Sequence, residues 1–170
     1  MQPVNNDDPK VVLKSLGSYS KERRRFLKSI SWTDSNRDPF SVASEIIVRH
    51  LLGGELARNQ VQKGWDLIDA TGRKVQVKYL ANAGEKWTNE HHVKFPDGVD
   101  IFALVVFEQH APRSILLFNK AHIAMLCDRL GKRHKNQDSE IQFTQVNYRS
   151  VLEEEIRLEQ ESLVSVYRIT

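Results

Sequence analysis

Residues 65–80 read WDLIDATGRKVQVKYL, and this stretch decides the fold that the sequence predicts. Polar and apolar residues alternate on both sides of its centre, which is the pattern of half-buried strands. At the centre, Asp69 is followed by Ala-Thr-Gly, and aspartate first with glycine last is typical of a type I turn. Gly72 closes a three-residue loop if it takes the left-handed conformation. We therefore predict a β-hairpin with strands over residues 65–69 and 73–80.

The loop length determines which residues of the hairpin share a face. With three loop residues, Asp66 stands opposite Gln76, and opposed residues point to the same side of a sheet. Three polar residues then gather on one face: Asp66, Gln76 and Lys78. Four apolar residues point to the other face, into a core: Trp65, Leu67, Val75 and Val77. A two-residue loop would mix the two sets, so the apolar pattern favours the first register.

The rest of the chain predicts a mixed set of helices and strands. Asp38-Pro39 gives a helix N-cap followed by proline at the first helical position, and Gly53-Gly54 ends this helix. We predict helices over residues 19–30, 40–52, 119–130 and 150–161. We predict strands over residues 55–60, 99–108, 114–118 and 141–146, an extended end over 164–169, and mostly loop over 81–98 and 131–140. This order predicts an α/β fold in which helices flank a mixed β-sheet.

Length and composition indicate a folded protein with one main domain. The 170 residues predict a single domain over residues 38–170, preceded by a basic helical arm over residues 1–37. Apolar residues make up 40% and charged residues 28%, which excludes a wholly disordered chain. The longest apolar run, residues 101–107, is shorter than the ~20 residues that span a bilayer, and the first ten residues do not resemble a signal peptide. We therefore expect a cytoplasmic protein without a membrane partner.

The single cysteine, Cys127, excludes an intramolecular disulfide and a cysteine-rich zinc site. It lies among apolar residues of a predicted helix, so we expect it in the core.

The basic residues are clustered, although the net charge is only +3. One cluster lies in the arm: Lys21, Arg23, Arg24, Arg25 and Lys28. A second group follows the hairpin: Lys86, His91, His92 and Lys94. A third lies near residues 129–135. Such patches can bind a polyanion such as DNA, and the alternative is that they are ordinary solvated surfaces.

The polar face of the hairpin has the composition of a cation site. A carboxylate and an amide oxygen suit Mg²⁺, which prefers oxygen ligands, and a neighbouring lysine can orient or deprotonate an attacking water. A phosphodiester is the substrate that needs these groups together. Glu45 is the natural additional acid, because it lies among apolar residues of the preceding helix. The alternative for Asp66 and Lys78 is a surface ion pair worth ~0–1 kcal/mol.

The run from Ser44-Glu45 through residues 65–68 to Gln76-Val77-Lys78 resembles the PD-(D/E)XK nuclease superfamily, over about residues 40–120. The resemblance implies a restriction-endonuclease-like fold. It also implies that Asp66, Glu45, Gln76 and the carbonyl of Val77 hold Mg²⁺, with Mn²⁺ as a substitute. Lys78 would be the water-orienting base or an electrostatic stabiliser. Gln76 departs from the acid usual at its position, so we expect weaker metal binding, or one ion instead of two.

This resemblance predicts a metal-dependent deoxyribonuclease that acts on double-stranded DNA. The small chain favours a type II restriction-type homodimer in which each subunit supplies one site. The arm cluster and the group around Lys86 and Lys94 are the predicted DNA contacts. Two alternatives stay open. One is a repair, recombination or transposition nuclease, acting alone or as a subunit of a complex. The other is an inactive DNA-binding module, which Gln76 would favour.

Overall fold

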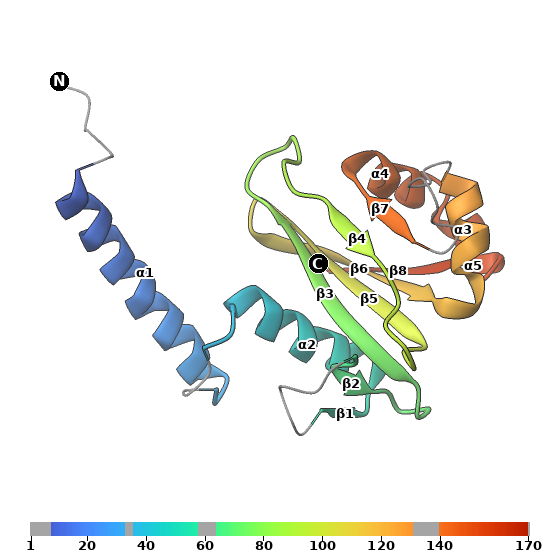
Figure 1. Cartoon of the computed structure of the whole chain (residues 1–170), viewed down its shortest axis with the longest axis horizontal. Coiled ribbons are helices and arrows are strands. Elements are labelled where there is room, and N and C mark those ends of the chain that lie inside the picture. The colour runs from blue at the N-terminus through green and yellow to red at the C-terminus, as the bar shows by residue number, and fades with distance from the viewer. Residues whose placement is uncertain (1–7, 33–35, 58–63, 131–139, 170) are drawn as a thin grey trace. The chain divides into compact units, whose positions relative to one another are not determined.

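Figure 1 shows the computed structural model, which describes residues 8–32, 36–57, 64–130 and 140–169. The chain divides into two compact units, residues 1–42 and residues 43–170. The predicted arm lies within the first unit, and the boundary between the units falls inside the second helix. In the described ranges, no helix is both long enough and apolar enough to cross a membrane.

The first unit is built around helix α1 (Pro9–Ser29), which begins ten residues earlier than the predicted range of 19–30. The side chain of Asp8 caps it by accepting a hydrogen bond from the backbone N–H of Lys10 at 2.9 Å. Asp8-Pro9 is the same start signal that predicts the next helix at Asp38-Pro39. Extending the helix to this signal adds apolar residues that stay exposed, among them Leu13 and Leu16.

Helix α2 (Pro39–Leu52) begins and ends where the sequence predicts. Asp38 Oδ1 accepts a hydrogen bond from the backbone N–H of Phe40 at 2.8 Å. After Leu52, Gly53 and Gly54 have φ of 68° and 88°, which is the left-handed region that favours glycine. At Gly54 there is also no room for a side chain, because a Cβ atom would fall on the carbonyl oxygen of Ile68.

The second unit contains a six-stranded sheet in the order β1-β2-β3-β5-β6-β8. Its strands are β1 (Glu55–Leu56), β2 (Leu67–Ile68), β3 (Lys74–Asn82), β5 (Ile101–Glu108), β6 (Ala111–Asn119) and β8 (Val164–Arg168). Only β3 and β5 pair in parallel, and the other four pairings are antiparallel. The predicted mixed α/β architecture is therefore confirmed.

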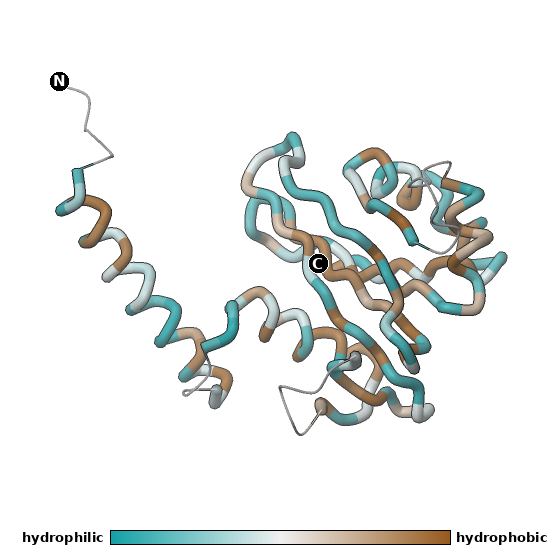
Figure 2. The backbone as a smooth tube through the Cα atoms, viewed as in Figure 1, coloured by the Kyte–Doolittle hydropathy of each residue, from teal (hydrophilic) through white to brown (hydrophobic). Residues whose placement is uncertain are grey.

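The central strand of this sheet is β5, which pairs with β3 on one side and β6 on the other. Every residue from Ile101 to Phe107 is buried, so both faces of the strand are covered, as its continuous apolar run predicts. Figure 2 shows apolar and polar segments alternating along β3 and also along α1.

Three helices and a two-stranded sheet form a core with one face of the main sheet. They are α3 (Ile123–Leu130), α4 (Gln145–Glu153), α5 (Glu155–Gln160), and the strands β4 (His91–Val93) and β7 (Ile141–Phe143). The core unites Phe102 and Leu104 of β5 with residues of all three helices. Cys127 of α3 lies in this core, which confirms its predicted packing role.

Several predicted boundaries are wrong. Strand β4 lies inside the predicted loop over 81–98, because its partner β7 is distant in the chain and three residues show no periodicity. The predicted helix over 150–161 is two helices, which begin at Gln145 and break at Glu154. Asn119 caps a short 3-10 turn, η1 (Lys120–His122), before α3 begins. The predicted strand residues 58–60 and most of the predicted loop over 131–140 lie outside the described residues.

Candidate active site

The hairpin turn is organised by Asp69, which the sequence identifies as a turn residue. Its Oδ1 accepts hydrogen bonds from the backbone N–H groups of Thr71 and Arg73, both at 2.9 Å, and its Oδ2 accepts one from Arg73 Nε at 2.8 Å. Gly72 has φ of 87°, so the three-residue loop forms as predicted. Burial acts to raise the pKa of the Asp69 carboxyl, but the hydrogen bonds from Arg73 and Thr71 outweigh it and hold that pKa below its ordinary value.

The hairpin has the predicted register but a shorter first strand. Leu67 pairs with Val75 and Ile68 pairs with Lys74. The chain bends at Asp66, however, so β2 begins only at Leu67 and not at residue 65. The backbone N–H of Asp66 still donates to the carbonyl of Val75 at 2.8 Å. Asp66 therefore lies where the two strands begin to diverge. Because it precedes β2, its side chain need not follow the alternation of strand side chains between the two faces of the sheet.

At this point the structure brings Asp66, Gln76 and Val77 together. Asp66 Oδ2 accepts a hydrogen bond from the backbone N–H of Val77 at 2.7 Å and another from the side-chain amide of Gln76. Gln76 is buried, at 6% exposure. Since the N–H and C=O of one strand residue point to the same side, the carbonyl of Val77 also points toward the strand edge occupied by Asp66. One carboxylate, one amide and one carbonyl thus meet at the mouth of the hairpin.

Lys78 follows on the same face of β3 as Gln76, because alternate residues of a strand share a face. Their partners on β5 are Phe102 for Gln76 and Leu104 for Lys78. Lys78 is exposed, whereas Gln76 is buried. Lys78 therefore leaves the same strand face as Gln76 and reaches solvent.

Glu45 lies on the buried face of α2. It is 4% exposed, and its neighbours Ser44 and Val48 are fully buried. This burial confirms that Glu45 does not lie on a solvated helix face. The Ser44 hydroxyl makes no hydrogen bond within the described part of the chain.

His91 lies near Lys78, although the sequence indicates only that it belongs to a basic loop. It is the first residue of β4, and its ring centre is 5.8 Å from that of Phe102, the strand partner of Gln76. Burial lowers the pKa of His91 to about 4, with further lowering by the charges of Lys78 and His92. A neutral imidazole therefore stands beside Lys78 at pH 7. The sequence could not reveal this contact, because it depends on the pairing of β4 with β7.

His92 and Lys94, two other residues predicted to contact DNA, both lie within ion-pair distance of Glu140. His92 Nε2 lies 2.9 Å from Glu140 Oε2, and Lys94 Nζ lies 2.8 Å from Glu140 Oε1. The hydrogen bond to Glu140 raises the pKa of Lys94, and the same bond lowers the pKa of Glu140. Lys86 is exposed in the segment before β4. Of this predicted group, His92 and Lys94 are therefore paired with Glu140, whereas Lys86 is exposed and His91 is partly buried.

The basic cluster of the arm lies on α1. Its exposed members are Lys21, Arg24, Arg25 and Lys28. Arg23 is half-buried and donates from Nη2 to the carbonyl of Arg37 at 2.6 Å, within the first unit. Arg25 lies 3.8 Å from Glu22, and both side chains are well exposed. The cluster is thus a solvent-facing positive surface, with Arg23 serving the unit's own structure.

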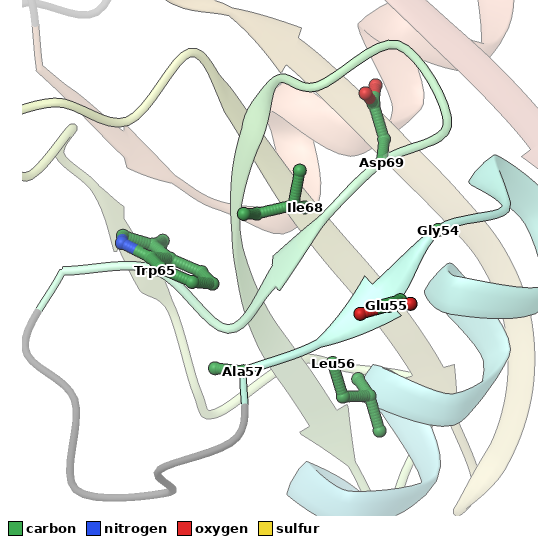
Figure 3. Close-up of a pocket in the computed structure, with 7 residues that line it drawn as sticks. All are labelled: Gly54, Glu55, Leu56, Ala57, Trp65, Ile68 and Asp69. Carbon is green, nitrogen blue, oxygen red and sulfur yellow. The ribbon is translucent and has the colours of Figure 1, made fainter.

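The predicted orientation of Trp65 is wrong. The sequence predicts that it points into the core with Leu67, but it is half-exposed and Lys74 Nζ lies 6.0 Å from its ring centre. Lys74 shares a face with Gln76, opposite to the face of Val75 and Val77. The bend at Asp66 interrupts the alternation, so residue 65 follows a different side of the sheet from Leu67. Trp65 and Ile68 line one pocket (Figure 3), and its volume is about 430 Å³.

Among the described residues, no group of three or more His, Cys, Asp or Glu side chains could hold a metal ion. A cation at the hairpin mouth would therefore depend on Asp66, on the neutral oxygens of Gln76 and Val77, and on water. Mg²⁺ tolerates such a set, because it commonly keeps several waters and uses one or two carboxylates. Searches against family models and curated proteins find no match for this chain.

Proposed function

We propose that the protein is a metal-dependent DNA endonuclease of the PD-(D/E)XK type, with a restriction-endonuclease-like fold. The observation that carries the proposal is the meeting of Asp66, Gln76 and Val77 at the diverging hairpin, with Lys78 two residues further along the same face. An acid, an oxygen-bearing neighbour and an ammonium group at one strand edge are the groups needed to hydrolyse a phosphodiester.

The residues at the hairpin mouth fit one Mg²⁺ ion better than two. Asp66 supplies the charged oxygen, Gln76 and Val77 supply neutral oxygens, and Glu45 is the remaining acid on the adjoining helix. When bound, the ion would neutralise charge on the phosphodiester and lower the pKa of the attacking water. Because the hairpin mouth has a single carboxylate, we expect it to bind Mg²⁺ weakly and to accept Mn²⁺ in its place.

Gln76 has a distinct role in this proposal. Its amide N–H donates to Asp66 Oδ2, so the carboxylate is satisfied without a cation. Rotation of the amide by half a turn exchanges its nitrogen and oxygen, and then presents two oxygens side by side. Gln76 therefore holds the site in order when it is empty and becomes a ligand when a cation enters.

Lys78 and His91 act on the substrate side of the site. Lys78 is exposed and cationic, so it attracts the phosphate and orients the attacking water. His91 is neutral at pH 7 and adds no competing positive charge beside the lysine. The exposed cations of α1 contact the DNA backbone.

We further propose that two copies of the chain act together as a type II restriction-type enzyme, each cutting one strand of the duplex. One observation favours a second function, that of an inactive DNA-binding module. The hydrogen bond between Gln76 and Asp66 completes the site without any metal, as a protein that no longer cleaves would require.

The test is cleavage of supercoiled plasmid with Mg²⁺ or Mn²⁺. We expect cutting by the parent protein, and a loss of about 100-fold or more in Asp66→Asn and Lys78→Gln, because both remove charge that acts in the transition state. Asp97→Asn and Lys120→Gln are matched controls, since both residues are exposed and lie outside the hairpin mouth. Equal activity in Asp66→Asn and the parent would refute the assigned site.

Gln76→Glu separates the nuclease from the inactive module. The new carboxylate would repel Asp66 when no cation is present, so the free energy of unfolding should fall by about 1 kcal/mol or more. Mg²⁺ should restore the loss, and the rise in Tm with Mg²⁺ should be larger than in the parent. Absence of cleavage in both the parent and Gln76→Glu, with DNA binding intact, would favour the inactive module.

A further inference from the structure

A pocket of about 430 Å³ lies beside the hairpin mouth, on strands β1 and β2 (Figure 3). Glu55 pairs with Ile68, and Ile68 pairs with Lys74, so these three residues form one row across β1, β2 and β3. Paired residues share a face, so the acid, the apolar side chain and the base all project to the same side of the sheet. Trp65 lies over this row, with its ring centre 6.0 Å from Lys74 Nζ.

The walls of the pocket offer groups that the fold itself does not use. Glu55 and Trp65 are both accessible, and Leu56 and Ile68 supply apolar surface. Within the residues that the structure describes, neither the carboxylate of Glu55 nor the ammonium of Lys74 takes part in an ion pair. An aromatic face and an unpaired acid therefore line one small volume, and the unpaired base, Lys74, lies 6.0 Å from the centre of the aromatic ring.

The pocket is next to the candidate active site. Trp65 immediately precedes Asp66 in the chain, and Lys74 is two residues before Gln76 on the same strand face. Two residues along a strand span about 7 Å. A molecule in the pocket would therefore lie about one nucleotide away from a phosphate held at Asp66 and Gln76.

We propose that this pocket binds a single unstacked nucleobase that carries an exocyclic amino group, from the DNA strand held at the active site. An aromatic side chain stacks on any base, and a glutamate accepts a hydrogen bond from the amino group of cytosine or adenine. Lys74, at the edge of the ring, pairs with the phosphate of the same nucleotide. The position of the strand rests on the proposed nuclease function, whereas the chemistry of the pocket does not.

The test measures binding of single-stranded oligonucleotides in EDTA, where no metal-dependent cleavage occurs. Fluorescently labelled oligo(dC) and oligo(dT) of equal length are titrated against the full chain and followed by anisotropy. We expect the parent to prefer oligo(dC), and Trp65→Ala to bind it about 5- to 100-fold more weakly, as expected for loss of one base–aromatic stack. Trp65→Phe keeps an aromatic face and should retain most of the affinity. Tyr167→Ala removes an exposed aromatic residue from the edge strand β8, and should bind like the parent.

Glu55→Gln tests the amino group separately. The amide weakens the acceptor and adds a donor, so the preference for oligo(dC) over oligo(dT) should fall while the stacking term stays. An oligonucleotide with one 5-iodocytosine, irradiated with the parent protein, should crosslink at Trp65, as located by mass spectrometry. In a competition experiment, free dCMP is added to the complex of the protein with the oligonucleotide. If it displaces the oligonucleotide at equal molar concentration, the ligand is a free nucleotide, and the strand part of the proposal is overturned.

The two proposals fail separately. Unchanged oligo(dC) affinity in Trp65→Ala, or a crosslink that maps only to other residues, would overturn the pocket assignment even if the protein cuts plasmid DNA. A crosslink at Trp65 in a protein that never cleaves would support the pocket and reject the nuclease. Circular dichroism of each variant shows that it is folded. If Trp65→Ala is not, the crosslink to the parent protein and the oligo(dC) preference of Glu55→Gln supply the measurement.

Discussion

Among single residues, Asp66 and His91 show how the hairpin and the small sheet meet. Asp66 accepts two hydrogen bonds from β3, so its carboxylate is fixed by the neighbouring strand and not by its own. His91 reaches the same region from β4, where it packs on Phe102 and feels the charge of Lys78. Its protonation state therefore reports on the surroundings of the site.

The low pKa of His91 gives a measurable titration. We expect its ring protons to titrate near pH 4 by NMR, because burial and two neighbouring charges oppose protonation. Lys78→Gln removes one of these charges and should raise the pKa of His91. Between the unfolded value of about 6.5 and the folded value, the unfolded chain binds the extra proton, so this group makes stability fall as the pH drops through that window. A His91 titration at the unfolded value of about 6.5 would contradict the structure.

At the scale of helices and strands, local signals were sufficient for some elements and not for others. The turn at Asp69, the helix start at Asp38 and the buried strand β5 each depend on neighbouring residues, and all three form as predicted. Strand β4, the break at Glu154 and the bend at Asp66 depend on contacts with distant parts of the chain. The same division holds for the site. The grouping of Asp66 with Gln76 follows from hairpin register, whereas the approach of His91 and the outward position of Trp65 do not.

At Gly54 the chain leaving α2 passes against the backbone of Ile68 and Asp69 with no room for a side chain. Gly54→Ala should lower the free energy of unfolding by more than ~2 kcal/mol, because φ is 88° and the new Cβ would lie 2.8 Å from Asp69 Cα and on the Ile68 carbonyl. Gly17→Ala is the matched control. Gly17 lies inside α1 with no atom near its Cβ position, so alanine should stabilise the helix by ~0.5–1 kcal/mol. Urea denaturation measures both, and equal effects of the two changes would show that β2 does not pass this close to Gly54.

At the scale of the whole molecule, the charged groups of interest are divided between the two compact units. The exposed cations of α1 lie in the first compact unit, whereas the candidate active site lies in the second. The hairpin mouth itself carries one acid, Asp66, and one base, Lys78, on the same strand face as Gln76. We infer that affinity for DNA comes mostly from α1 and chemistry from the hairpin mouth.

Salt dependence of DNA binding tests this division. Replacing Lys21, Arg24 and Arg25 together by glutamine should reduce the slope of log K against log salt by about 3, because each phosphate contact contributes ~0.9. Cleavage at saturating DNA should change little. Lys120→Gln, on an exposed turn of the second unit, should leave the slope unchanged. If the triple variant has the same slope as the parent, these residues of α1 do not contact DNA.

The parallel pairing of β3 with β5 has a consequence for motion in the site. Eight consecutive residues of β3 are paired with β5, a strand buried on both faces. Strand β3, which carries Gln76 and Lys78, therefore cannot shift without opening the core. Strand β2, on the other side of the site, pairs with β3 through only two residues and begins after the bend at Asp66. If the site moves when a cation or a DNA strand binds, Asp66 and the start of β2 must therefore move, while β3 stays in place.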